Sequence, residues 1–118
     1  MQLNIRQAYL IMYHLLDKMC DEYTDECLIH LVSNFSPYIF LNSMSADPAA
    51  WWDWGNVVSK ITKDEFLSPI DVLRAAVEFM RFHQDEFGFE IGWVIDKLNN
   101  LSVDSQEWIS ALNEALKE

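Results

Sequence analysis

One local pattern recurs five times along this chain and constrains its fold more than any other feature. In each copy an apolar residue precedes a side chain that can cap a helix, and a second apolar residue follows at the fourth helical position. The capping oxygen accepts an otherwise unpaired backbone N–H, and the two apolar residues pack together where the helix begins. The copies are Leu3-Asn4 with Ala8, Tyr23-Thr24 with Leu28, Ala46-Asp47 with Trp51, Leu67-Ser68 with Val72, and Val103-Asp104 with Trp108.

Apolar residues follow these starts at spacings of three and four, which is typical of amphipathic helices. Hairpin signals are scarce, because the chain has only three glycines and neither Asn-Gly nor Asp-Gly. We therefore predict an all-α fold, a compact single-domain bundle of five or six helices over residues 1–118. The helices are expected near 5–22, 25–35, 48–61, 69–87 and 105–117, with a shorter one near 90–99 after Gly88 ends its predecessor.

The charge balance narrows the classes of partner. The chain has 19 acidic and 8 basic residues, a net charge of −11. Direct binding to nucleic acid or to an anionic membrane is disfavoured, because both need neutralising Lys and Arg side chains. The same balance favours either solubility or attraction to a basic partner. No apolar run reaches the roughly 18 to 20 residues of a membrane span, and the first residues do not look like a secretory signal, so a cytoplasmic protein is expected.

The segment DPAAWWDW, residues 47–54, places three tryptophans on one predicted helix. Asp47 and Pro48 start the helix, Trp51 packs at its beginning and Trp54 points to the core, at about 100° per residue. Trp52 is left on the polar side. The glycine that follows, Gly55, is expected to make room for a ring or a neighbouring backbone, since glycine costs about 1 kcal/mol against alanine inside a helix.

Four large apolar residues fall off the apolar faces of their predicted helices: Leu10, Trp52, Phe82 and Trp93. Two interpretations remain open. Loops or a second layer of helices cover them, or they form an exposed aromatic patch that anchors a partner. On the predicted helix over 69–87, the core-facing set is expected to include Ile70 and Phe87.

Residues suited to catalysis or metal binding form no complete constellation. Cys27 and His30 could supply two metal ligands, but no second pair at ligand spacing completes a site. Cys20 and Cys27 flank the first predicted turn, where two packed thiols are the simpler interpretation and a disulfide stays open. His83-x2-Glu86 matches half of a di-iron motif in reverse, and the rest is absent. We therefore predict neither an enzyme nor a cofactor.

Acidic residues cluster at two predicted helix ends, where carboxylates oppose the helix dipole. They are either a solvated face or a surface shaped for a basic partner. With the aromatic residues they complete the candidate partner-binding set, which is Asp17, Asp21, Glu22, Asp25, Glu26, Asp85, Glu86, Glu90, Trp52, Phe82 and Trp93.

Three segments carry a resemblance to a set of short, acidic, uncharacterised bacterial proteins that are all-helical. They are AYLIMYHLLDKM, then LIHLVSNFSPYIFLNSMSADPAAWWDW, then VEFMRFHQDEFGFEI. The similarity covers about residues 5–92. Some members of this set resemble immunity proteins of polymorphic or contact-dependent toxin systems. The resemblance therefore implies a protein that neutralises a toxin, and it carries no functional residues over.

These observations lead to three hypotheses about function. The first is a non-enzymatic binding protein, most concretely a bacterial immunity protein whose acidic surface neutralises a basic toxin, for example a nuclease. The second is an adaptor, a regulatory subunit or a homodimer that uses the aromatic patch. The third is a helical bundle that binds a small molecule or a metal. The sequence leaves the oligomeric state open.

Overall fold

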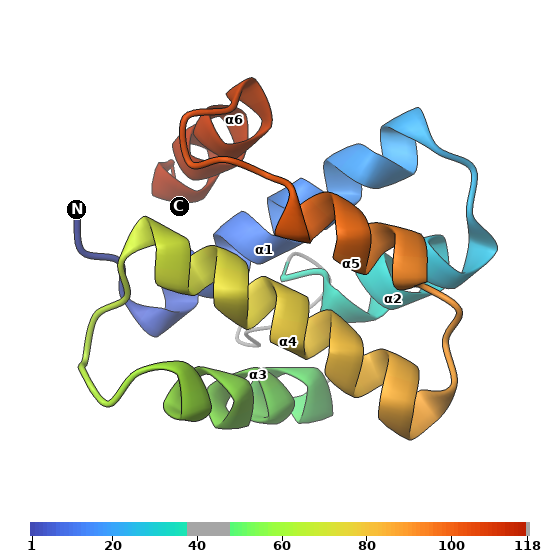
Figure 1. Ribbon diagram of the computed structural model, residues 1–118, viewed down its shortest axis with the longest axis horizontal. Helices are drawn as coiled ribbons and strands as arrows, with labels where there is room; N and C mark the ends of the chain where they lie inside the picture. The colour runs from blue at the N-terminus through green and yellow to red at the C-terminus, as the bar shows by residue number, and fades with distance from the viewer. Residues whose placement is uncertain (38–47, 118) are drawn as a thin grey trace.

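The computed structural model describes residues 1–37 and 48–117, which form six α-helices (Figure 1). The helices are α1 (Ile5–Glu22), α2 (Glu26–Phe35), α3 (Pro48–Ile61), α4 (Pro69–Phe87), α5 (Gly92–Asn99) and α6 (Gln106–Leu116). The only β pairing in these residues is one antiparallel bridge between Leu3 and Leu67. The predicted all-α class is confirmed, and the radius of gyration of 13.0 Å is that of a compact domain. None of the helices in the described ranges is long and apolar enough to cross a membrane.

Two of the predicted capping residues are confirmed. The Asn4 side chain accepts the backbone N–H of Gln7 at 2.7 Å, and the Gln7 side chain accepts that of Asn4 at 2.9 Å. Ser68 accepts the N–H of Asp71 at 3.2 Å and is followed by Pro69 at the first helical position. These side chains fix the starts of α1 and α4 because they satisfy backbone donors that the helix itself leaves unpaired.

Two other predicted caps lie one residue too early. Helix α2 is capped by Asp25 rather than Thr24, and α6 by Ser105 rather than Asp104. Ser105 accepts the N–H of Trp108 at 3.2 Å and also donates to the carbonyl of Ser102 at 2.6 Å. That second bond closes a turn before α6, so Ser105 is the better capping residue. The predicted cap Asp47 lies outside the described residues.

Two glycines were assigned structural roles, and only one assignment is correct. Gly88 ends α4 in the left-handed conformation, with φ 74°, and its N–H donates to the carbonyl of Gln84 at 3.1 Å. Gly55 lies inside α3, and a Cβ atom built on it would meet no atom within 4 Å. The expectation that Gly55 makes room for a neighbour is therefore wrong.

Replacing Gly55 with alanine is expected to raise the free energy of unfolding by about 0.5 to 1 kcal/mol. The added methyl group meets open space, and alanine has the higher helix propensity. Urea denaturation followed by circular dichroism measures the change. A loss of stability would mean that a close neighbour surrounds this position after all.

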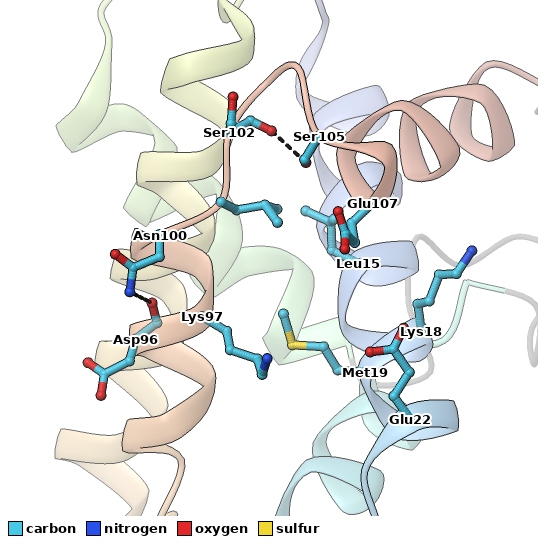
Figure 2. Close-up of a pocket in the computed structure, with 11 residues that line it drawn as sticks. Leu15, Lys18, Met19, Glu22, Asp96, Lys97, Asn100, Ser102, Ser105 and Glu107 are labelled. Atoms are coloured by element: carbon cyan, nitrogen blue, oxygen red, sulfur yellow. Dashed lines mark hydrogen bonds between the residues drawn. The ribbon is translucent and has the colours of Figure 1, made fainter.

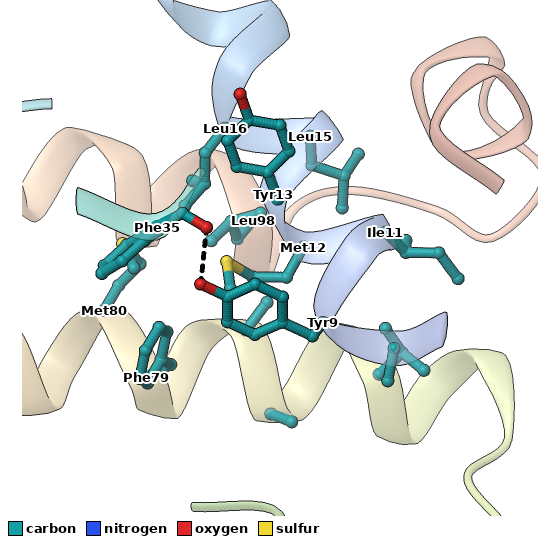
Figure 3. Close-up of a cluster of buried hydrophobic side chains, with 14 of the residues drawn as sticks. Tyr9, Ile11, Met12, Tyr13, Leu15, Leu16, Phe35, Phe79, Met80 and Leu98 are labelled. Atoms are coloured by element: carbon teal, nitrogen blue, oxygen red, sulfur yellow. Dashed lines mark hydrogen bonds between the residues drawn. The ribbon is translucent and has the colours of Figure 1, made fainter. Parts of the chain in front are cut away.

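The core surrounds α1, which packs against α2, α3, α4 and α6. Aromatic rings from α1, α2, α3 and α4 cluster in this core, and Figure 3 shows Tyr9, Phe35 and Phe79 among them. The Tyr9 hydroxyl donates to the carbonyl of Phe35 at 2.6 Å, and the Trp54 indole donates to the carbonyl of Ile5 at 3.2 Å. The Phe79 ring centroid lies 5.2 Å from that of Trp54. Each buried polar group in the cluster thus has a partner, as a stable core requires.

Two assignments of side chains to the core are wrong, and the open question about Leu10 is answered. Leu10 is fully buried, so the interpretation that neighbouring segments cover it is confirmed. Helix α6 packs on α1, and the Lys18 ammonium donates to Ser110 at 3.2 Å. Ile70 and Phe87 are 60% and 59% exposed. They lie at the two ends of α4.

Candidate protein-binding surface

Both acidic clusters lie at one end of the molecule. The first, Asp17, Asp21, Glu22, Asp25 and Glu26, surrounds the α1–α2 turn, and the second, Asp85, Glu86 and Glu90, surrounds the α4–α5 connection. Figure 1 shows the turn and the connection on the same side of the bundle, on the right of that view. We call these eight residues the acidic end.

Side-chain contacts hold the two parts of the acidic end together. The Trp93 indole, at the start of α5, donates to Asp25 Oδ2 at 2.7 Å. The same indole packs against Tyr23, with ring centroids 5.1 Å apart. His30 on α2 stacks on Phe89 of the connection at 6.0 Å. Residues that are 59 to 70 positions apart in the sequence are thereby held together.

Asp25 and Trp93 therefore have a structural role as well as a place in the candidate set. The Asp25 carboxylate caps α2 by accepting the N–H of Leu28 at 3.1 Å and uses its other oxygen for the Trp93 indole. The pKa of Asp25 is lowered, first by the Leu28 N–H and then by the Trp93 indole. Trp93 is half-buried. Both bonds favour the ionised carboxylate, so Asp25 stays charged at neutral pH.

The remaining carboxylates of the acidic end face solvent. All are exposed except Asp17, which is half-buried. The three salt bridges among the described residues lie elsewhere, at Arg74–Asp71, Arg81–Glu78 and Lys117–Glu114. Arg81, four residues before Asp85, instead bonds Glu78 at 2.7 Å. Asp85 thus belongs to none of the salt bridges among the described residues.

The chain's charge is concentrated at this end. Residues 17–30 and 85–97 together hold nine Asp or Glu and two Lys, which is 9 − 2, or seven net negative charges of the chain's eleven. One of the two lysines, Lys97, lies over the Tyr23 ring, 4.7 Å from its centroid. Like charges gathered in this way produce a field that attracts a basic molecule and repels an acidic one.

The aromatic candidates do not form one patch. Trp52 on α3 is 72% exposed, whereas Phe82 and Trp93 are half-buried. The Phe82 ring contacts that of Phe87 at 5.7 Å, and Trp93 contacts Tyr23. No ring contact among the described residues joins Trp52 to either. Trp52 is thus the one member whose exposure is large, and sequence reasoning missed the exposed Phe87.

The cysteines and His83, considered above for catalysis or metal binding, are half-buried or buried. Cys20 and Cys27 are half-buried free thiols. The pKa of Cys20 is raised to about 11, mainly by burial and further by the charges of Asp17 and other nearby carboxylates. Cys20 is therefore a poor nucleophile at neutral pH. His83 is 5% exposed, and its Nδ1 lies 2.8 Å from the carbonyl of Phe79. No group of three or more His, Cys, Asp or Glu in the described ranges is arranged to hold a metal ion.

His83 also lines a pocket of about 280 Å³ between α2, α3 and α4. The pocket's single carboxylate is Asp53, and its other lining is mostly aromatic and aliphatic. A di-iron bundle site needs several carboxylates together with its histidines. The lining that the structure describes here does not supply them.

One feature near the acidic end could not be found from the sequence. A groove of about 480 Å³ lies between α1, α5 and the start of α6 (Figure 2). Its lining comes from residues 15–22 and 96–107, which the fold brings together. No local pattern in the sequence links these two segments.

Comparison with known proteins adds no relative. No family model, curated protein or solved structure shows significant similarity to the chain. The interpretation of the acidic end therefore depends on its own geometry and charge.

Proposed function

We propose that this protein is a non-enzymatic, cytoplasmic bacterial protein that binds a basic protein partner through its acidic end. Most concretely, it is an immunity protein that neutralises a basic toxin. One observation carries the proposal, which is that seven of the eleven net negative charges lie at one end of the bundle. The resemblance described above supports the same function.

Charge placement explains how such a protein would act. A toxin that binds nucleic acid presents Lys and Arg side chains to phosphates. Carboxylates at the acidic end would occupy the same positions and so compete with the phosphates. The field of the clustered charges would also raise the rate of encounter by about 10- to 1,000-fold at low salt. Three of the exposed carboxylates, Glu26, Glu86 and Glu90, come from both clusters, and replacing them tests this mechanism directly.

A growth assay tests the proposed function. The product of the gene immediately upstream is taken as the candidate toxin. It is expressed alone and together with this chain. We expect growth to stop in the first case and to continue in the second. An upstream product that does not arrest growth, or an arrest that the chain does not relieve, would contradict the proposal.

Charge-matched variants test whether the acidic end carries the effect. The variant Glu26→Gln/Glu86→Gln/Glu90→Gln removes three charges from it. The control Asp64→Asn/Glu65→Gln/Asp71→Asn removes three from the α3–α4 connection and the first turn of α4, which Figure 1 shows on the opposite side of the molecule. We expect the first variant to lose protection and the second to keep it. Equal protection by both would show that another surface binds the toxin.

A second function, a homodimer or adaptor, is favoured by one observation. Trp52 is 72% exposed, and single exposed tryptophans often anchor interfaces. Sedimentation velocity at rising protein concentration tests whether the chain forms a dimer. A dimer that Trp52→Ala abolishes would support it, whereas a monomer at all concentrations would rule out the homodimer.

A further inference from the structure

The groove between α1, α5 and the start of α6 combines an apolar floor with an acidic rim. Leu15, Met19 and Leu101 supply its apolar lining, and Glu22 at the end of α1 and Glu107 at the start of α6 add carboxylates (Figure 2). Its volume of about 480 Å³ lies within the range of about 300 to 1,000 Å³ seen for ligand pockets. Such a groove can take a short peptide segment or a few side chains.

A cation already lies in this groove. Lys97 extends from α5 toward Met19 in Figure 2, and its ammonium lies 4.7 Å from the centroid of the Tyr23 ring. The pKa of Lys97 is raised, first by a hydrogen bond with the Tyr23 side chain and also by Glu22 and Glu107. The other lysine of the lining, Lys18, points away from the groove and donates to Ser110 at 3.2 Å. The groove's surroundings therefore favour a positive charge over a negative one.

The groove is continuous with the acidic end, since Glu22 belongs to both. A partner drawn to the acidic end would reach the groove without crossing another surface. Its lysine or arginine would meet Glu22 and Glu107, while a neighbouring apolar side chain would cover the floor. Long basic side chains suit such a place because their apolar stems can pack while the charged tip stays at the rim.

We propose that this groove binds a short segment of the basic protein partner, with an apolar side chain on Leu15, Met19 and Leu101 and a Lys or Arg between Glu22 and Glu107. This inference rests on the proposed function, and it names the part of the partner that the acidic end would hold. Lys97 then acts as an internal stand-in for the partner's cation, and binding moves it aside.

A peptide titration tests the groove without the toxin. Capped Lys-Leu-Leu-Lys is added to the full chain carrying ¹³C-labelled methionine methyl groups, and the signals are followed by NMR. We expect the Met19 signal to shift, while those of the buried Met12 and Met80 stay in place. Capped Glu-Leu-Leu-Glu and Lys-Gly-Gly-Lys are expected to shift Met19 far less, because one lacks the charge and the other the apolar side chains.

Variants of the rim give the decisive comparison. Glu22→Gln/Glu107→Gln is expected to weaken binding of Lys-Leu-Leu-Lys by about two- to fivefold per carboxylate, as for exposed charge pairs. Lys97→Met is expected to strengthen it, since the internal cation is gone. The control Asp64→Asn/Glu65→Gln, which has the same net charge as the first variant, should bind like the unmodified chain.

Two results would overturn the inference: a Met19 signal that the Lys-Leu-Leu-Lys peptide leaves unmoved, or equal weakening by the rim variant and its control. Neither result bears on whether the chain relieves a growth arrest in the assay above. Conversely, a failed growth assay leaves the peptide titration unaffected. The failure of the groove and the failure of the proposed function are therefore separate outcomes.

Discussion

Replacing Trp54 with alanine is expected to lower the free energy of unfolding by about 3 to 5 kcal/mol, whereas replacing Trp52 should change it by less than about 0.5 kcal/mol. Trp54 is fully buried, packs edge-on against Tyr9 and Phe79, and donates to the carbonyl of Ile5 at 3.2 Å. Trp52 is 72% exposed. Two tryptophans on one helix, two positions apart, should thus differ by several kcal/mol.

Urea denaturation followed by far-ultraviolet circular dichroism measures both effects. A loss of about 3 to 5 kcal/mol is a large part of the stability of an ordinary domain, so Trp54→Ala could fail to fold. Trp54→Phe keeps a ring in the core and loses only the indole bond and some area, so an intermediate loss is expected. A cost at Trp52 equal to that at Trp54 would contradict the assignment of core and surface on α3.

The second large effect is expected at Asp25. Asp25→Ala removes the cap of α2 and the acceptor of the Trp93 indole, and we expect a loss of about 2 to 3 kcal/mol. Asp25→Asn keeps the cap and loses the charged bond, so it should cost about 1 kcal/mol. In a double-mutant cycle with Trp93→Phe, the two changes should be less than additive. Strict additivity would mean that the 2.7 Å bond contributes nothing.

The pH dependence at Asp25 has a definite sign. Its pKa is lower in the folded chain than in the unfolded one, because the Leu28 N–H and the Trp93 indole favour the carboxylate. Its contribution is therefore complete above the unfolded pKa of about 4, and it is lost as the pH falls through the folded value. Asp25→Asn has no such group. The difference in free energy of unfolding between the unmodified chain and Asp25→Asn should accordingly shrink when the pH is lowered from 7 to 3.

Local signals in the sequence were enough for the helices. Asn4 with Gln7, Ser68 with Pro69, and Gly88 each act on backbone groups a few residues away, so their effect can be read from the chain. The caps of α2 and α6 were predicted one residue too early, because two adjacent side chains could each serve as the cap. The structure uses Asp25 and Ser105. Which one does so depends on contacts made elsewhere, such as the bond from Trp93 to Asp25.

Contacts between distant segments could not be predicted. The apolar pattern placed Leu10 on a polar side of its helix, yet it is fully buried in a helix that packs against four others. The reverse holds for Phe87, which the pattern placed in the core and the structure leaves 59% exposed. The acidic clusters were visible in the sequence, but their common position follows from the packing of α5 against the α1–α2 turn.

The central claim is that the acidic end captures a basic partner by its charge. The most direct test is the association rate constant with the upstream-encoded protein, measured by stopped-flow fluorescence at low and at physiological salt. For Glu26→Gln/Glu86→Gln/Glu90→Gln we expect a rate about tenfold below that of Asp64→Asn/Glu65→Gln/Asp71→Asn at low salt, and a smaller difference at physiological salt, because ions screen exposed charges. Equal rates for the two variants at both salt concentrations would contradict the account.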